Sequence, residues 1–438
     1  MKEKQRFALN HNNKDFRDPE GIDLLARTES FYQWQDTRNR LGLWPYSRAL
    51  YGAPGTVTSI QDACGVLTKE GINLASQDYL SLATSEQVKE AAIRTIRDYG
   101  VHSAGSAAVL GNTGLSLKLE TALAEFLNTG HVTLYPTGWA AGYGAIRGLV
   151  RAGDYIVMDE LSHTCLKEGA YASTKNIATF KHNDADHAAK LLALIRKKNS
   201  KNGILLITES LFSMDSDTPD IARLQRICQE NSATLLVDVA HDLGAMGKNG
   251  TGALGAQNML GKVDIVMGSF SKTFASNGGF VASHSPAVKQ FLKIHSPSQT
   301  FSNALSPAQA ATVLEALKIV ASPAGELLRN KLMQNILFLR DKLSQRNLNI
   351  MGMPSPIVPV LVSEPNTLHS EAKARLAARL LPNFGILANL AEFPGVPTGL
   401  ARFRLQVMAG HNSEMLEAAA DKLSQAINQA EFELHDTF

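Results

Sequence analysis

Lys272 is the residue of this chain whose type and surroundings most readily suggest covalent chemistry. It lies between Ser271 and Thr273, just after an apolar run and just before Gly278 and Gly279. A lysine among small hydroxyl residues at the end of a buried strand is poor core material, but its amine can form an imine with an aldehyde. Most lone lysines are solvated loop residues, so this interpretation needs support from other positions.

Asp238 ends the apolar run of residues 233–237. A carboxylate at a buried strand end is costly unless a cation or a strong donor pairs with it, and a protonated pyridine nitrogen would serve. The structural alternative is an aspartate that caps a turn or a helix. His241, three residues further on, is either a structural histidine or a donor to a phenolic oxygen of the same ligand.

Gly138 and Trp139 follow another predicted strand and open a helix rich in glycine and alanine. Free backbone N–H groups at a helix amino terminus favour a phosphate, and a glycine permits its close approach. Residues 142–144 fail the full GxGxxG pattern, and the sequence has no GxxxxGK[ST] loop. The pattern therefore disfavours a nicotinamide enzyme and a nucleoside triphosphate enzyme.

His163 follows the next predicted strand, and its imidazole could stack on a flat aromatic cofactor. The alternative is that Ser162 caps a helix beside a passive histidine. Taken together, these residues predict a pyridoxal-phosphate (PLP) site, with a lysine for the aldehyde, an acid for the ring nitrogen and N–H groups for the phosphate. The predicted set lies in chain order at the ends of separate strands: Gly138, His163, Asp238, His241 and Lys272.

The elements that must position these residues alternate from about residue 130 onward. Short apolar runs and amphipathic segments follow one another, which is the pattern of β-α units around a parallel sheet. The carboxyl ends of such strands meet at one edge, where ligands bind in open α/β sheets. The sequence thus predicts an α/β protein whose large domain has a mostly parallel sheet flanked by helices. The predicted strands are 131–135, 154–158, 177–180, 203–208, 233–238 and 263–268, and the predicted helices include 185–198 and 220–230.

A smaller α+β domain is predicted to begin at Ser306, because a serine cap followed by Pro307 is typical of a helix start. Its expected elements are helices over 307–320 and 326–345, strands over 357–362 and 403–408, and a final helix. The first 60 residues are polar with interspersed aromatic residues, and we expect an arm that packs on another part of the protein. The predicted domains are 1–60, the N-terminal arm; 61–305, the PLP-binding domain; and 306–438, the small C-terminal domain.

The composition of the chain limits the kinds of partner that it can bind. The chain has 438 residues, 44% of them hydrophobic, and its 43 basic and 41 acidic residues offer no broad footprint for nucleic acid or an anionic membrane. Cys64, Cys165 and Cys228 are too few and too scattered for a disulfide framework or a metal site. No secretory signal and no membrane span are evident. We expect a cytoplasmic protein with reduced thiols, a small-molecule substrate and no metal.

Five motifs give the chain a strong resemblance to the α-oxoamine synthases, a family of fold-type-I PLP-dependent enzymes. The resemblance covers residues 50 to 435, and its most specific parts are the last two motifs with their spacing. The motifs are PTGWAAG (136–142), DELSHTCLKEGA (159–170), ESLFSMDSDTPDI (209–221), LLVDVAHDLGAMGKNGTG (235–252) and GSFSKTFASNGGF (268–280).

The resemblance implies roles for the cofactor residues. Lys272 would form the internal aldimine, Asp238 would hold the ring nitrogen, His163 would stack on the ring and His241 would bind its phenolic oxygen. Lys272, His163 and Asp238 are then the catalytic residues.

The resemblance also implies the residues around the phosphate and the substrate. Ser269, Ser271 and the Gly138-Trp139 backbone would hold the phosphate, and Ser302 would add a hydroxyl to it from the neighbouring subunit of a homodimer. Arg404 falls where the family binds the amino-acid carboxylate, a task that suits a planar, bidentate guanidinium.

Several positions depart from the family pattern, and one of them is Val239, which replaces the glutamate of the usual VDEAHS. Asp242 replaces a serine in the usual VDEAHS, and Asp78 stands where the family commonly has Asn-Asn-Tyr-Leu-Gly, so a substrate contact at Asp78 departs from the pattern. Ala107 replaces the arginine of a frequent Gly-Ser-Arg, and Ser116 replaces a histidine. These changes leave the cofactor residues intact and concern the substrate.

The resemblance implies a decarboxylative Claisen-type condensation of a small amino acid with an acyl thioester, either acyl-CoA or acyl carrier protein. The products would be a 2-amino ketone, carbon dioxide and free thiol, with Lys272 as the base that removes the α-proton. Two alternatives stay open: another fold-type-I PLP activity, such as an aldolase or aminotransferase, and a catalytically silent partner subunit. Retention of Lys272, Asp238 and His163 together argues against the silent subunit.

Overall fold

A computed structural model describes residues 2–62, 65–364 and 369–437, so Cys64 lies outside the described residues. The chain forms two compact units. The central unit comprises Asp78–Ser213 and Asp217–Asn330. The terminal unit comprises Met1–Gln77, Met214–Ser216 and Lys331–Phe438. This division differs from the predicted domain bounds, because the N-terminal segment shares a sheet and a core with the C-terminal segment.

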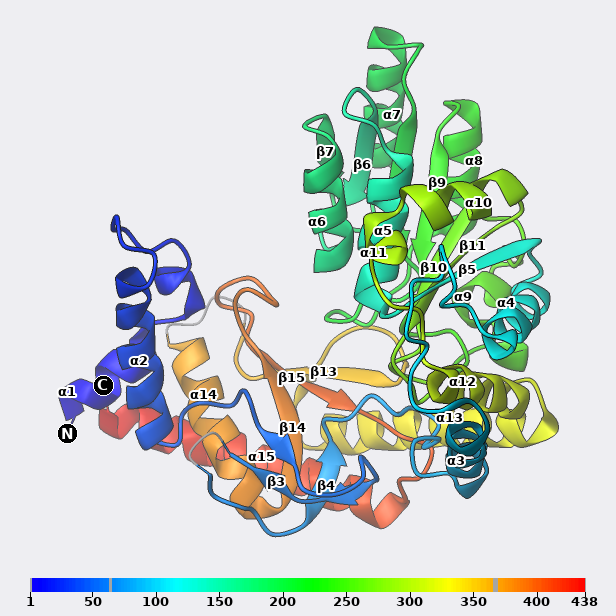
Figure 1. Ribbon diagram of the computed structural model, residues 1–438. Coiled ribbons are helices and arrows are strands. Elements are labelled where there is room, and N and C mark those ends of the chain that lie inside the picture. Colours follow the sequence, from blue (N-terminus) through cyan, green and yellow to red (C-terminus); the bar gives the residue numbers. More distant parts are fainter. Residues whose placement is uncertain (1, 63–64, 365–368, 438) are drawn as a thin grey trace. The chain divides into compact units, whose positions relative to one another are not determined.

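The central unit is built on a seven-stranded sheet in the order β5-β11-β10-β9-β8-β6-β7. Six of the strands match the predicted strands to within two residues. Neighbours among β10, β9, β8, β6 and β7 are parallel. The strands are β5 His131–Tyr135, β6 Tyr155–Asp159, β7 Ile177–Phe180, β8 Ile204–Glu209, β9 Thr234–Asp238, β10 Ile265–Ser269 and β11 Gly279–Ser283 (Figure 1).

The sequence analysis did not predict β11, which runs antiparallel to both β5 and β10. Gly278 and Gly279 obscured the strand, since glycine is typical of turns. Their lack of a side chain is needed here: a Cβ on Gly279 would lie 2.7 Å from the Gly138 Cα, and one on Gly278 would lie 2.7 Å from the Phe270 ring. The chain therefore turns back into the sheet directly after Lys272.

Alternate residues of each strand face opposite sides of the sheet, and helices cover both sides. Helices α5 (Gly138–Leu149), α6 (Thr164–Ser173) and α10 (Pro286–His295) supply residues to the core that includes Ile156, Met158 and Leu236. On the other side, α7 (Ala185–Lys198) and α8 (Ile221–Glu230) pack against β6, β7 and β9.

The central unit is completed by helices outside the β-α units. Helix α12 begins at Pro307 and is capped by Ser306 in a capping box, as the sequence predicts, and it packs against α3 and α4. Its contacts place it in the central unit, so the predicted start of the small domain at residue 306 differs from the observed division. The bounds are α3 Glu86–Tyr99, α4 Gly114–Phe126, α9 Gly252–Ala256, α11 Pro297–Thr300 and α12 Pro307–Val320. Helix α13, Pro323–Gln345, is divided after Asn330: its first part belongs to the central unit and its longer second part to the terminal unit.

The terminal unit has a mixed six-stranded sheet in the order β12-β13-β15-β14-β4-β2. Strand β4 comes from the N-terminal segment and pairs in parallel with β14, which joins the two ends of the chain in one sheet. The strands are β2 Val57–Thr58, β4 Gly71–Leu74, β12 Asn349–Ile350, β13 Ile357–Leu361, β14 Ile386–Ala391 and β15 Arg402–Gln406, and the helices are α14 Ser370–Leu380 and α15 Ser413–Thr437. The short pair β1 Ala49–Leu50 and β3 Ile60–Gln61 forms a separate ribbon.

The N-terminal arm packs on the C-terminal part of the same unit. Helices α1 (Lys2–Asn10) and α2 (Glu29–Arg40) contact each other, and α1 also contacts α14 and α15. Arg38 of α2 is fully buried and pairs with Glu392 at 3.4 Å, with its guanidinium over the rings of Trp34 and Trp44. The aromatic residues that the sequence analysis noted are thus the anchor of the arm.

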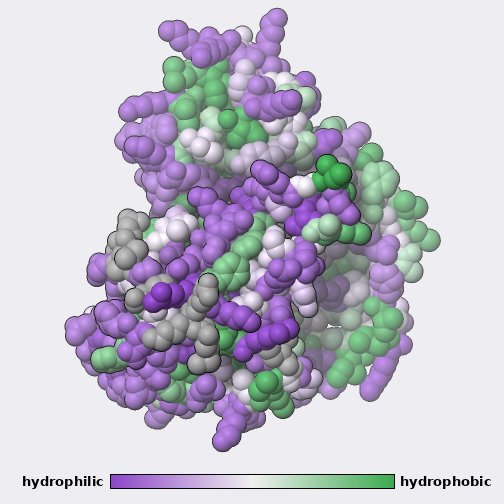
Figure 2. Space-filling view, turned by 90° about the vertical axis from the view of Figure 1, so that its left-hand side faces the viewer, coloured by the Kyte–Doolittle hydropathy of each residue, from purple (hydrophilic) through white to green (hydrophobic). Residues whose placement is uncertain are grey.

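Among the helices of the described residues, none has the length and apolar character needed to cross a membrane. On the face drawn in Figure 2, hydrophilic residues cover most of the surface and hydrophobic residues form separate groups.

Candidate active site

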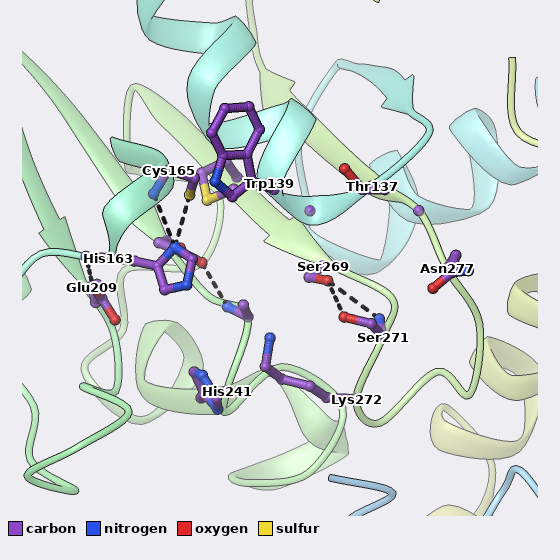
Figure 3. Close-up of a pocket in the computed structure, with 15 residues that line it drawn as sticks. Thr137, Trp139, His163, Cys165, Glu209, His241, Ser269, Ser271, Lys272 and Asn277 are labelled. Atoms are coloured by element: carbon purple, nitrogen blue, oxygen red, sulfur yellow. Dashed lines mark hydrogen bonds between the residues drawn. The ribbon is translucent and has the colours of Figure 1, made fainter. Parts of the chain in front are cut away.

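The ends of β6, β8, β9 and β10 and the start of α5 surround a cavity of about 250 Å³ in the central unit. Figure 3 shows Ser269 and Ser271 on one side of it, His163, Cys165 and Glu209 on the other, and Lys272 pointing toward its centre. Eight of the predicted site residues line this cavity: Gly138, Trp139, His163, Asp238, His241, Ser269, Ser271 and Lys272.

Lys272 lies on the loop between β10 and β11 and is half-buried. Two main-chain hydrogen bonds close this loop: Phe270 N–H donates to the Gly278 carbonyl at 3.0 Å, and Ser276 N–H donates to the Phe270 carbonyl at 3.1 Å. Both phenylalanine rings of the loop, Phe270 and Phe274, are buried. The buried rings fix the loop, which presents the Lys272 amine to the cavity.

Asp238 ends β9 and is buried, with its carboxylate accepting a hydrogen bond from Ala240 N–H at 2.9 Å. Burial raises the pKa of Asp238, and the nearby Lys272 amine and the Ala240 N–H oppose this rise. The Ala240 contact is the turn-capping interaction that the sequence left open. A single backbone donor compensates a buried carboxylate only in part, so the site favours a cationic ligand group at Asp238.

His241 is held by Tyr79, whose hydroxyl lies 2.8 Å from His241 Nδ1. Tyr79 is fully buried, so this contact fixes the orientation of the imidazole. The sequence analysis did not predict Tyr79 as part of the site. Its partner is 162 residues away in the chain, and no local pattern signals the pairing.

His163 is the N-cap of α6, since its Nδ1 accepts a hydrogen bond from Cys165 N–H at 3.2 Å. Ser162 does not cap the helix: its hydroxyl is buried and has no hydrogen-bond partner among the described residues. The backbone N–H of His163 donates to Glu209 Oε1 at 2.5 Å. Glu209 ends β8 and lines the cavity, and the sequence analysis gave it no role.

The start of α5 and the end of β10 approach each other closely at Gly138. A Cβ at this position would lie 2.4 Å from both Cβ and Oγ of Ser269. Thr137 caps the helix by accepting from Ala140 N–H, and the Ser269 and Ser271 hydroxyls lie 2.7 Å apart. Backbone N–H groups at a helix amino terminus beside two hydroxyls are a donor set that fits a phosphate. With Lys272 and Asp238 in the same cavity, the residues present fit PLP.

Three predicted residues do not line this cavity. The Asp78 carboxylate caps a turn by accepting from the N–H groups of Leu82 and Ala83, and burial raises its pKa to about 6 against these donors. Ser302 is half-buried on the loop after α11. Arg404 belongs to β15 of the terminal unit.

Asp242, a departure from the family pattern, has a structural role in the central unit. Its carboxylate accepts hydrogen bonds from Ser210 Oγ and from Ala253 N–H, both at 2.6 Å. A Cβ on Gly252 would lie 2.5 Å from Asp242 Oδ2, so this glycine is required next to the carboxylate. Asp242 thus ties the residue after β8 to the first turn of α9.

Comparison with known proteins shows the family of the chain. Residues 69–423 match the family described as aminotransferase class I and II. The chain is 33% identical to 8-amino-7-oxononanoate synthase of Geobacter metallireducens over 90% of its own length and 96% of that protein. It belongs to this family, in the α-oxoamine synthase group. The chain is also 29% identical to serine palmitoyltransferase of Sphingobacterium spiritivorum, over 94% of this chain and 98% of that one.

The solved structures agree on the fold. Serine palmitoyltransferase of Sphingomonas wittichii superposes with a TM-score of 0.85 at 25% identity, covering 94% of this chain and all of that one. A serine palmitoyltransferase structure that holds a PLP internal aldimine gives the same TM-score at 24% identity, covering 93% of this chain and 99% of that one. The protein has the fold-type-I α/β architecture and is a PLP-dependent acyltransferase of the α-oxoamine synthase type, as the resemblance implies.

Proposed function

We propose that this chain condenses a small amino acid with an acyl thioester and releases carbon dioxide and free thiol as it forms a 2-amino ketone. The convergence of Lys272, Asp238 and His163 in one cavity of the central unit carries the proposal. The names of the relatives support this chemistry, since an 8-amino-7-oxononanoate synthase and a serine palmitoyltransferase both match the chain over nine-tenths of its length.

Bound PLP supplies an electron sink that stabilises negative charge at the α-carbon of the amino acid. Lys272 would hold the cofactor through Nζ, and its amine would remove the α-proton of the amino acid. Asp238 would keep the ring nitrogen protonated, because a buried carboxylate stabilises a neighbouring cation. His163 would stack on the ring and orient the substrate carboxylate, while His241, fixed by Tyr79, would bind the phenolic oxygen.

The phosphate is assigned to the Gly138-Trp139 main chain, Ser269 and Ser271. We assign the amino-acid carboxylate to Arg404, whose guanidinium lies 3.8 Å from Met214 Sδ, and we keep Asp78 as a proposed substrate contact. With its amide oxygen facing the guanidinium, Gln406 accepts a hydrogen bond from Arg404 Nε at 2.6 Å.

The cytoplasmic location of the protein stays a prediction.

Replacement of Lys272 by alanine tests the assignment. We expect Lys272→Ala to lose the visible absorption band of bound PLP and to lower turnover by roughly a thousand-fold or more, because the general base is removed. The exposed residue Lys248, at the start of a short 3-10 helix, gives a matched control, and Lys248→Ala should keep both properties. An unchanged spectrum in Lys272→Ala would contradict the lysine assignment.

Thiol release distinguishes the proposed reaction from its rivals. Glycine, alanine and serine, each with short and long thioesters of CoA or acyl carrier protein, should give thiol only when both substrates are present. Full turnover with the amino acid alone, or with pyruvate or glyoxylate as acceptor, would indicate an aldolase or aminotransferase. A protein that stays colourless with added PLP would be a silent subunit.

We further propose a homodimer with shared sites, in which Ser302 of one subunit contacts the phosphate bound by the other. If so, mixing inactive Lys272→Ala protein with a Ser302 variant should restore activity in mixed dimers, because one site would regain both residues. Co-purification of two differently tagged subunits measures whether mixed dimers form. Mixed dimers without recovered activity would argue against shared sites.

A further inference from the structure

Glu209 and Asp238 are paired carboxyl groups at the ends of neighbouring strands. They face each other in the register between β8 and β9, and both line the cavity. Partners in a parallel register share a face of the sheet, so the two side chains enter the cavity together. Their exposed fractions are 3% and 6%, which leaves little water to screen them from one another.

Glu209 also holds the chain that carries His163. Its Oε1 accepts the His163 backbone N–H at 2.5 Å, at the residue that caps α6. The dashed lines in Figure 3 show this contact together with those of His163 Nδ1 to Cys165. With Nδ1 accepting from Cys165 N–H, the proton of a neutral imidazole lies on Nε2. The carboxyl group of Glu209 therefore acts on the position of the His163 ring through the main chain.

The charges around this pair allow only one carboxylate. Glu209 interacts with the acids Asp238 and Asp159 and with the cations Lys272 and Lys167. Burial first, and then Asp238, raise the pKa of Glu209 well above its usual range, against the His163 N–H. For Asp238, Lys272 opposes the effect of burial most strongly. The proton of the pair thus belongs on Glu209 and the negative charge on Asp238.

We propose that Glu209 is a positioning residue that works as a neutral acid: it fixes the main chain at His163 and leaves Asp238 as the charged member of the pair. A second carboxylate would compete with Asp238 for the proton of the ring nitrogen, whereas a neutral acid cannot. The proposal deepens the proposed function, since it rests on the roles of His163 and Asp238 toward PLP, and it is independent of the choice of substrates.

Glu209→Gln imitates the neutral acid, because the amide oxygen can still accept from His163 N–H and the group cannot ionise. In the holoenzyme at pH 7, infrared difference spectroscopy should show the C=O band of a protonated carboxylic acid in the wild type and its loss in Glu209→Gln. PLP affinity should stay within about threefold of the wild type. The pH midpoint of the PLP absorption band should not move. Glu168 of α6, an exposed acid, provides the control Glu168→Gln, which should leave the infrared band in place.

Glu209→Leu removes the hydrogen bond as well, and we expect PLP to bind at least tenfold more weakly. Wild-type PLP affinity in this variant would overturn the positioning role. Absence of the protonated-acid band, or a shifted midpoint in Glu209→Gln, would overturn the neutral state. If the leucine variant does not fold, the infrared and pH measurements on Glu209→Gln decide alone. None of these measurements needs turnover. If the proposed condensation is wrong, the infrared band and the pH midpoint of the wild type stay as they are, so that failure can be told apart from a failure of the Glu209 proposal.

Discussion

Single residues determine how closely the segments around the proposed PLP site approach each other. Gly138 is the first residue of α5, and Ser269 lies against the place where a side chain would stand. Tyr79 orients His241 from a distant part of the sequence, and Glu209 holds His163. His241 and His163 are therefore each held by a neighbour that has no chemical step of its own in our proposal.

Gly138→Ala should weaken PLP binding at least tenfold. Its Cβ would lie 2.4 Å from Ser269 Cβ, so the main chain that donates to the phosphate must move, at a cost of roughly 1–3 kcal/mol. Fluorescence titration of PLP measures the effect. Gly114 is the first residue of α4, and its Cβ would meet only Tyr99 Oη at 4.0 Å. Gly114→Ala should bind PLP like the wild type, and equal binding by Gly138→Ala would refute the close-approach argument.

At the scale of the elements, one histidine, His182, connects segments that follow three different strands. His182 follows β7, and its ring nitrogens lie 2.9 Å from Asp159 of β6 and 2.9 Å from Asp217 of the segment after β8. The edge of the Phe212 ring also packs on it. His163 lies on the segment after β6, and Glu209 is the last residue of β8, so the His182 bridge supports the side of the cavity that these two residues line.

The His182 bridge should make stability fall at alkaline pH. Burial would lower the pKa of His182, but the hydrogen bonds to Asp159 and Asp217 outweigh it and raise the pKa to about 10. Because the folded protein keeps a proton that the unfolded chain loses above about pH 6.5, the contribution is complete below that pH. It disappears as the pH rises toward 10 and amounts to on the order of 1–3 kcal/mol.

Denaturant unfolding between pH 6 and pH 10 checks this prediction. His182→Gln should be less stable at pH 6 and should show a flatter pH dependence than the wild type. The exposed residue His295 of α10 supplies the control, since His295→Gln should follow the wild-type curve. Parallel curves for His182→Gln and the wild type would contradict the proposed bridge.

At the scale of the whole molecule, the two ends of the chain meet in the terminal unit. β4 pairs with β14, and a buried ion cluster joins α2 to the residue after β14. Glu392 lies between Arg38 and Arg375, and the Tyr46 hydroxyl donates to it at 2.8 Å. Burial would raise the pKa of Glu392, but Arg375 and Arg38 more than offset this and lower it.

Glu392→Gln should destabilise the terminal unit by about 3–5 kcal/mol, because it leaves two buried guanidinium groups without their carboxylate. The midpoint of denaturant unfolding and protease cleavage near the arm measure the loss. Glu417 provides the control, as it is half exposed and pairs with Lys342 at 3.1 Å. Glu417→Gln should cost less than about 1 kcal/mol. Similar losses in both variants would mean that the buried cluster does not anchor the arm.

The sequence by itself determined the parts of this protein that depend on local pattern. Periodicity and caps predicted six strands of the central sheet and the start of α12, since alternating burial and capping act over a few residues. Residues at successive strand ends could be expected to share one edge, which is why Lys272, Asp238, His163 and His241 were found together. The motifs and the comparisons agree on the family.

Only the tertiary structure decided the features that depend on distant pairs. The antiparallel β11, the Tyr79 contact to His241, the Glu209 support of His163 and the union of both chain ends in one unit each join segments that no short window contains. Their physical basis is burial: a polar group removed from water must find its partner wherever the fold places one. Local sequence patterns do not reveal which distant residue that partner will be.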